Sequence, residues 1–206
     1  MEIQKSVNAL WRIKNKGAIM NKVYLQGKYM DGKFYTRRTS GTVDEIPVEQ
    51  PVELVDGGFY KCEAILVTKN VSVENKRCKK HMVRILTSQK LAPQEIDGYI
   101  NELEVDGFLV QKCEVRTTPF GRTIVDFTIA INNESGVSYY PSCIAWGGAA
   151  HFVSALRIGT HIKLKGRFQS REYCKMVGDK PETRTAYEIC CSRVVAHGKE
   201  NYYGKE

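Results

Sequence analysis

The sequence predicts an all-β protein whose second half is a β-barrel with one short helix. Short segments that alternate between apolar and polar residues indicate strands, because side chains along a strand point to alternate faces. Segments rich in glycine, proline or asparagine separate these strands and indicate turns. One segment, residues 147–159, has helical spacing instead, with apolar side chains at Ala149, Phe152, Val153 and Leu156.

The elements of the second half follow in the order strand, strand, strand, helix, strand, strand. The first strand bends at Gly107, and the first hairpin turns at Pro119 and Gly121. The predicted elements are strands at residues 102–110, 123–131 and 139–146, the helix at 147–159, and strands at 160–175 and 184–195. This is the order of the five-stranded oligonucleotide/oligosaccharide-binding barrel, or OB-fold.

The first half carries a fainter copy of this pattern. Four residues recur 80 positions later: Asn21, Val23, Leu25 and Gly27 correspond to Asn101, Leu103, Val105 and Gly107. Residues 81–87 are a candidate third strand, residues 28–58 suit a long hairpin or an inserted loop, and no fourth or fifth strand is recognisable before Pro93. Two interpretations stay open, an internal repeat and a chance similarity between short alternating segments.

These patterns divide the chain near residues 91–99, where Pro93 and Gly98 interrupt the strands. We expect residues 98–206 to form an OB-fold domain. We expect residues 1–97 to form a divergent or incomplete OB-like module, or an accessory N-terminal module. Residues 2–13 have the spacing of a short amphipathic helix.

Charge and composition favour a soluble protein that binds polyanions. The 206 residues carry a formal net charge of +8, and the sequence pI is about 9.1. No apolar run reaches the roughly 18–20 residues of a membrane span, and the first residues do not resemble a signal peptide. We therefore expect a cytoplasmic protein with no membrane partner.

Neither a metal site nor an active site is expected. The seven cysteines include no C-x-x-C pair, which favours reduced, mostly packed thiols over a zinc site or a disulfide framework. The four histidines show no ligand spacing, and no phosphate-binding glycine loop occurs. Asp106, Asp126 and Glu188 lie on separate predicted strands, although a metal-dependent nuclease needs clustered carboxylates. We expect no catalytic residues and no cofactor.

The strand at residues 160–175 carries the clearest functional pattern. Its odd-numbered positions are basic, polar or aromatic, namely His161, Lys163, Lys165, Arg167, Gln169, Arg171, Tyr173 and Lys175. Between them lie Ile162, Leu164, Gly166 and Phe168, so one face is core and the other is a row of cations. Such a face suits a phosphate backbone with stacked bases. A solvated surface is the alternative, but no acid interrupts the run before Glu172, which argues against simple salt bridges.

Residues 101–195 resemble bacterial single-stranded DNA-binding proteins and the related primosomal replication proteins. The most specific segment is Gly159-Thr160 followed by KGRFQSREY at residues 165–173. The resemblance implies an OB-fold and places Tyr140, Trp146 and Tyr173 where that family stacks bases. It also implies that the hairpin carrying Arg116, Phe120 and Arg122 flanks the path of the strand.

The resemblance implies non-enzymatic, largely sequence-independent binding and protection of single-stranded DNA in replication, repair or recombination. The pattern does not separate DNA from RNA. The alternative is a protein–protein assembly module of a replication or mobile-element transfer complex, with incidental nucleic-acid binding. We expect a homo-oligomer, and a dimer if both halves are OB-folds. The short, non-acidic end of the chain puts in doubt the family's recruitment of partners through an acidic tail.

Overall fold

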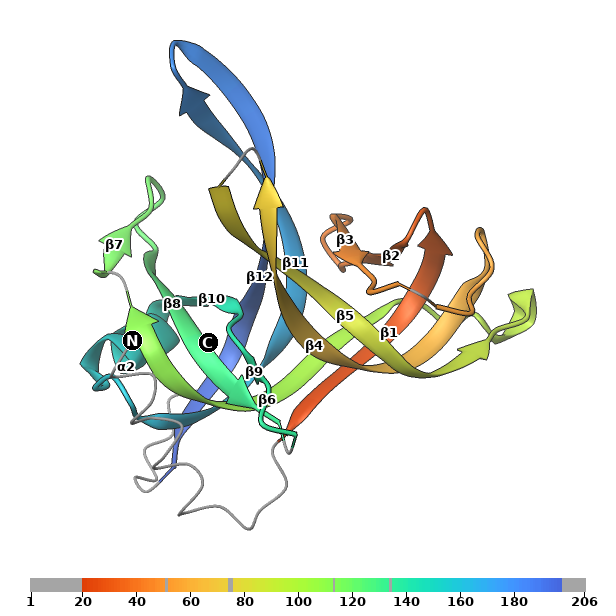
Figure 1. The fold of residues 1–206 in the computed structure, drawn as a ribbon, viewed down its shortest axis with the longest axis horizontal. Coiled ribbons are helices and arrows are strands. Elements are labelled where there is room, and N and C mark those ends of the chain that lie inside the picture. The colour runs from red at the N-terminus through yellow and green to blue at the C-terminus, as the bar shows by residue number, and fades with distance from the viewer. Residues whose placement is uncertain (1–19, 51, 74–75, 113, 134, 198–206) are drawn as a thin grey trace. The chain divides into compact units, whose positions relative to one another are not determined.

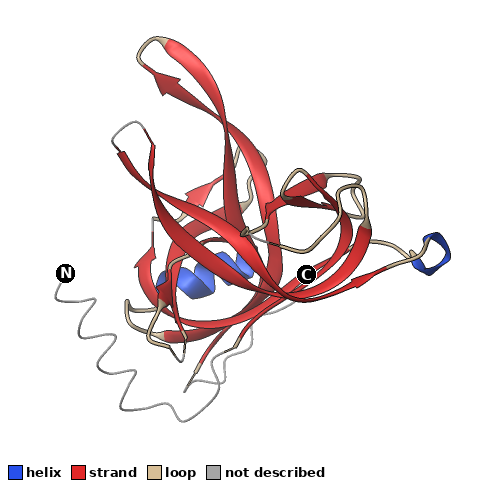
Figure 2. Cartoon of the chain, turned by 45° about the vertical axis from the view of Figure 1, so that its right-hand side comes forward, coloured by secondary structure: helices blue, strands red, loops and turns tan. Residues whose placement is uncertain are grey.

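The computed structural model describes residues 20–50, 52–73, 76–112, 114–133 and 135–197, and nearly all of their regular structure is strand (Figures 1 and 2). The all-β class is therefore confirmed. The helix expected at residues 2–13 lies outside the described residues. The strands are β1 (Asn21–Met30), β2 (Lys33–Arg37), β3 (Val43–Pro47), β4 (Phe59–Val73), β5 (Lys76–Lys90), β6 (Ile100–Lys112), β7 (Arg116–Thr117), β8 (Thr123–Asn132), β9 (Ser138–Tyr139), β10 (Ser142–Trp146), β11 (His161–Val177) and β12 (Lys180–Ala196).

The chain forms two compact units. Unit 1 comprises Met1–Asn21, Glu104–Gly166 and Cys191–Glu206, and unit 2 comprises Lys22–Leu103 and Arg167–Cys190. Strands β6, β11 and β12 each contribute residues to both units. The boundary expected between residues 97 and 98 stays a prediction, and the units are described separately below.

Unit 2 is built on β1, which pairs antiparallel with β2 on one side and β4 on the other. The hairpin β2–β3 occupies part of the region expected to be a long hairpin or inserted loop. Strands β4 and β5 form a second, much longer hairpin, which contains the strand expected at residues 81–87. The core of unit 2 contains Leu25, Phe34, Ile46, Leu66 and Val83, each at most 1% exposed.

Unit 1 is centred on β8, which pairs with β6, β7, β9 and β10. The helix α2 (Gly147–Ala155) begins where β10 ends, and Gly147 makes this turn with a φ of +53°. Two of its side chains, Ala150 and Val153, are fully buried. Of the four positions that the helical spacing selected, Val153 is buried, whereas Ala149, Phe152 and Leu156 are partly exposed. Among the described residues, the other helical segment is the short 3₁₀ helix η1 (Pro93–Glu95), which lies in the predicted linker.

Gly27 and Gly107, the last pair of the 80-residue repeat pattern, occupy equivalent environments in their own units. Gly27 lies on β1, where a Cβ would overlap the carbonyl oxygen of Tyr35 on β2. Gly107 lies on β6, where a Cβ would stand 2.8 Å from the carbonyl oxygen of Ala130 on β8. In each unit the backbone of a neighbouring strand occupies the space that a side chain would need. The same steric reason therefore explains why glycine stands at both positions.

Of the six cysteines whose side chains are described, all are free thiols, and Cys62, Cys143, Cys190 and Cys191 are buried. Burial raises the pKa of Cys62 to about 12, which keeps this thiol protonated and unreactive at neutral pH. Cys78 and Cys174 are exposed.

Candidate nucleic-acid interface

In unit 1, the ring of Trp146 and the guanidinium of Arg116 belong to one cross-strand row. Trp146 ends β10 and pairs with Ile124 on β8, and Ile124 pairs on its other side with Arg116 on β7. Residues directly opposite each other in antiparallel strands project from the same face. Trp146 is 37% exposed, and Arg116 forms an ion pair with Asp126 on the same face. This face therefore carries an exposed aromatic ring and a cation on two strands that flank β8.

The other aromatic and basic residues expected in unit 1 lie nearby in sequence but in less regular structure. Phe120 is 93% exposed in the turn between β7 and β8, and Arg122, also exposed, closes that turn. Tyr140 is half-buried and follows β9, and with Pro141 it interrupts the strand expected over residues 139–146. The alternation that grouped Tyr140 with Trp146 is therefore not continuous.

Lys163 and Lys165 lie on the expected outer face of β11, and both are ion-paired to Glu104 on β6. The ammonium of Lys163 is 3.4 Å from one carboxylate oxygen of Glu104, and Lys165 contacts the other oxygen. The bond from Lys165 lowers the pKa of Glu104 below its ordinary value of 4.5. The argument against salt bridges was therefore wrong, because the acid that pairs with the two lysines comes from a neighbouring strand.

Five of the predicted residues, Arg167, Gln169, Arg171, Tyr173 and Lys175, lie in the part of β11 that belongs to unit 2. The alternation holds as far as Phe168, which is buried, and then fails because Gln169 is buried as well. The amide nitrogen of Gln169 donates to Glu188, and its oxygen accepts from Arg38 (3.3 Å) and Arg167 (3.1 Å). Gln169 thus forms part of an internal polar network instead of facing a ligand directly.

Beyond this network, β11 and β12 continue as a hairpin arm, residues 171–185 (blue in Figure 1), whose residues are exposed on both faces. Arg171 forms an ion pair with Glu188 and stands over the ring of Tyr173, 5.9 Å from its centroid. Tyr173 is 37% exposed, and Lys175 is exposed near the end of the arm. Here a ring and its neighbouring cations are accessible together.

Unit 2 also contains a basic cavity that the sequence analysis missed. A cavity of about 410 Å³ is lined by Arg37, Arg38 and Arg167, and by Tyr99, which is 46% exposed. The ring of Tyr99 packs against Phe59 with centroids 5.4 Å apart. Arg38 neutralises the buried carboxylate of Asp44, and Glu102 offsets one of the two remaining arginines, so the lining keeps a net charge of +1. Arg37, which ends β2, and Arg38, which follows it, were the available signal, but the segment was expected only to be a long hairpin or an inserted loop.

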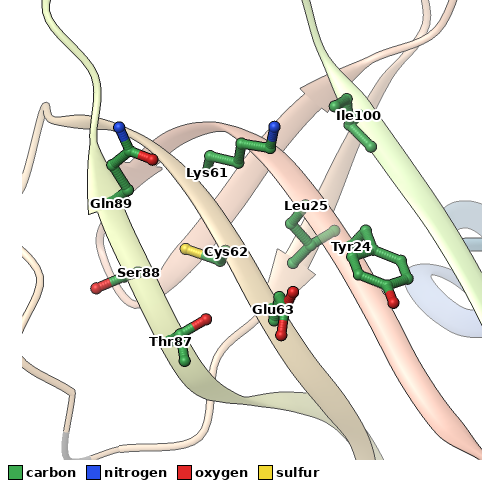
Figure 3. Close-up of a pocket in the computed structure, with 9 residues that line it drawn as sticks. All are labelled: Tyr24, Leu25, Lys61, Cys62, Glu63, Thr87, Ser88, Gln89 and Ile100. Atoms are coloured by element: carbon green, nitrogen blue, oxygen red, sulfur yellow. The ribbon is translucent and has the colours of Figure 1, made fainter.

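A second cavity of unit 2, of about 470 Å³, is less suited to a polyanion (Figure 3). Its lining comes from β1, β4 and β5, with Ile100 from β6. Tyr24 supplies a ring and Lys61 an ammonium group, but the carboxylate of Glu63 lies in the same lining. The opposed charges make this cavity electrostatically neutral.

Across the described residues, no helix is both long and apolar enough to cross a membrane.

Residues 100–196 match the model of the Single-strand binding protein family. The chain is also similar in structure to the wild-type single-stranded DNA binding protein from Thermus aquaticus, with 16% identity and a TM-score of 0.63 over 92% of this chain and 98% of the other. A deletion mutant of that protein gives 18% identity and a TM-score of 0.62, over 92% of this chain and 99% of the other. PriB from Ralstonia solanacearum gives 20% identity over 48% of this chain and 99% of the other, at a TM-score of 0.37. A comparison with curated protein sequences gives no match. The Thermus comparison extends the shared fold over both halves of the chain.

Proposed function

We propose that this chain binds and protects single-stranded DNA in replication, repair or recombination, because residues 100–196 match the model of the Single-strand binding protein family. Binding is largely independent of base sequence and involves no catalysis, and the protein works in the cytoplasm. The observation that carries the proposal is the cross-strand row in unit 1 that contains the exposed ring of Trp146 and the guanidinium of Arg116, with Ile124 between them. A base stacked on such a ring contributes about 1–3 kcal/mol whatever its identity.

In this mechanism, phosphates displace carboxylates from the basic side chains of unit 1. Asp126 holds Arg116, and Glu104 holds Lys163 and Lys165. A bound phosphate takes over these partners, and Arg122 and Phe120 extend the surface along the first hairpin. If about five phosphates are neutralised, the log–log dependence of affinity on salt has a slope near −3.5.

Unit 2 contributes through its own basic and aromatic residues. Arg171, Tyr173 and Lys175 are accessible on the hairpin arm. The cavity lined by Arg37, Arg167 and Tyr99 supplies a further basic and aromatic surface. The buried side chain of Gln169 accepts a hydrogen bond from Arg167 and so helps to position that guanidinium. The contribution of Gln169 to binding is therefore indirect.

Tryptophan fluorescence tests the proposal directly, because the chain has only two tryptophans, Trp11 and Trp146. In the Trp11→Phe variant, oligo-dT quenches the remaining fluorescence and raises the anisotropy of a labelled strand. The matched Trp146→Phe variant reports on Trp11 alone. Anisotropy binding without quenching of Trp146 contradicts the site, whereas no preference for oligo-dT over duplex DNA contradicts the function. An oligo-rU strand of equal length distinguishes DNA from RNA.

A role as an assembly module is the second candidate, favoured by apolar side chains on the hairpin arm. Met176 is 61% exposed and Val177 is 43% exposed, which is unusual for residues with no binding role. We propose that the protein is a homo-oligomer, with a dimer as the favoured state. Light scattering at micromolar concentration tests this, and a monomeric mass contradicts it. A Met176→Ser/Val177→Ser variant that loses the oligomer but binds oligo-dT normally assigns the arm to assembly.

A further inference from the structure

Three residues of unit 1 that are far apart in the sequence meet at one place in the fold. Asp106 lies on β6, His161 begins β11, and His197 directly follows β12. Their ligand atoms, one carboxylate oxygen and two imidazole nitrogens, all lie within 4.8 Å of one another. The backbone N–H of His197 donates to the carbonyl oxygen of His161 at 2.9 Å, which fixes the two histidines side by side. Their 36-residue separation is why ligand spacing was not visible in the sequence.

One oxygen of the Asp106 carboxylate has no hydrogen-bond partner among the described residues. This oxygen, Oδ1, is buried and accepts no hydrogen bond from any residue in the described part of the chain. The nearest group is Nε2 of His197 at 3.8 Å, which is too far for a hydrogen bond. Leaving a buried carboxylate oxygen unsatisfied is costly, so the environment favours a cation at this point.

The two imidazole rings lie next to each other. The rings of His161 and His197 are stacked with centroids 4.2 Å apart and planes 14° from parallel, and Phe108 stacks on the other face of His161. A neutral imidazole nitrogen is the commonest protein ligand for transition metals.

We propose that Asp106, His161 and His197 bind a divalent transition-metal ion of the zinc type. Two imidazoles and one carboxylate suit Zn²⁺ and its neighbours better than Mg²⁺ or Ca²⁺, which prefer oxygen ligands alone. In a tetrahedral site with bonds of about 2.0–2.1 Å, the ligand atoms stand about 3.3 Å apart. The ligand atoms therefore move closer together by up to about 1.5 Å. The rings also turn out of their stack, because each lone pair lies in its ring plane.

Movement of His197 is sufficient for most of this closure. Its side chain is 52% exposed and lies after the last strand, whereas Asp106 is 16% exposed and is held within β6. The bound ion ties the end of β12 to the start of β11 and to β6, so it acts as a clip within unit 1. The proposal is independent of DNA binding.

The test uses full-length protein without an affinity tag, because a histidine tag would bind the same ion. After treatment with a chelator, the protein is titrated with ZnCl₂ by calorimetry, and its thermal unfolding is followed with and without Zn²⁺. We expect one saturable site per chain and a higher midpoint with Zn²⁺. Co²⁺ substituted for Zn²⁺ gives a spectrum without thiolate charge-transfer bands, which separates this site from the cysteines.

Two variants locate the site. Asp106→Asn and His197→Gln keep the size and polarity of each side chain, and each is expected to weaken Zn²⁺ binding at least tenfold and to remove the shift in midpoint. His151→Gln, on the exposed face of α2, is the matched control and keeps both. Absence of saturable binding by the parent protein, unchanged affinity in both variants, or thiolate bands with Co²⁺ would each overturn the proposal. Circular dichroism establishes whether each variant is folded. If Asp106→Asn does not fold, the Zn²⁺ affinity of His197→Gln alone tests the proposal.

Discussion

At the scale of single residues, Glu104 controls how much positive charge unit 1 offers to a phosphate. It holds both Lys163 and Lys165, so under the proposed function a DNA phosphate must displace this carboxylate before it gains these contacts. We expect Glu104→Gln to bind oligo-dT about 3–10-fold more tightly at low salt, with a steeper salt dependence. Titrations at two salt concentrations measure both quantities. Glu63→Gln, which removes a carboxylate from unit 2, is the control, and equal gains in both variants would show only a change in net charge.

His81 is the residue whose burial makes stability depend on pH. It is 7% exposed on β5 beside Thr68, and burial lowers its pKa to about 4 from an ordinary value of 6.5. The unfolded chain takes up this proton below pH 6.5, whereas the folded protein does so only near pH 4. The stabilisation is therefore complete above pH 6.5 and is lost between pH 6.5 and 4, by about 3 kcal/mol.

Urea denaturation across this pH range measures the effect. In His81→Phe the decrease in unfolding free energy between pH 6.5 and 4 should become shallower by that amount. Parallel curves for the parent and the variant would contradict the assignment to His81.

Residues also mark where a sequence pattern stops being informative. Alternation along residues 161–168 correctly separates buried Ile162 and Leu164 from accessible Lys165. It fails at Gln169, because hydrogen bonds with Arg38, Arg167 and Glu188 satisfy the polar atoms of the amide and reduce the free-energy cost of burying it. Arg38 and Glu188 come from segments far away in the sequence, and a period-two pattern holds no information about them.

At the scale of elements, Gly107 on β6 permits the close approach of β8. A methyl group there meets the backbone carbonyl of Ala130, which cannot move without disturbing the pairing. We expect Gly107→Ala to lower the unfolding free energy by about 1–3 kcal/mol, and Gly27→Ala to act similarly in unit 2. Gly148→Ala, in the first turn of α2 with open space around its Cα, is the control and should be neutral or stabilising by up to about 1 kcal/mol. Equal, small effects of all three substitutions would contradict the packing argument.

Elements with strong local patterns were predicted well, and those without were not. Alternation predicts the strand β8, and helical spacing predicts the helix α2. Gly159 predicts the turn that separates α2 from β11. The five-residue strands β2 and β3 are too short to show a period, and Lys76–Lys90 is polar over much of its length. Pairing with β4 makes β5 a strand, and that pairing is non-local.

At the scale of the whole molecule, the proposed domain 98–206 can be tested as a fragment. It keeps the family-matched residues 100–196 but lacks Arg38 and Asp44, which bond to Gln169 and Ser170 in unit 2. We expect this fragment to fold and bind oligo-dT, with an unfolding free energy at least about 2 kcal/mol below that of the full chain. Urea denaturation of both proteins measures the difference. A fragment as stable as the full chain would show that residues 22–97 contribute nothing to its folding.

The three strands that contribute to both units have a consequence during protein synthesis. Unit 2 needs Arg167–Cys190, and unit 1 needs Cys191 and the residues after it, so neither is complete until β12 has left the ribosome. A nascent chain that has reached only residue 160 therefore exposes unpaired edges in both units at once. The first half of the chain therefore completes its unit only after the second half has been synthesised, unlike a protein whose domains follow one another in the sequence.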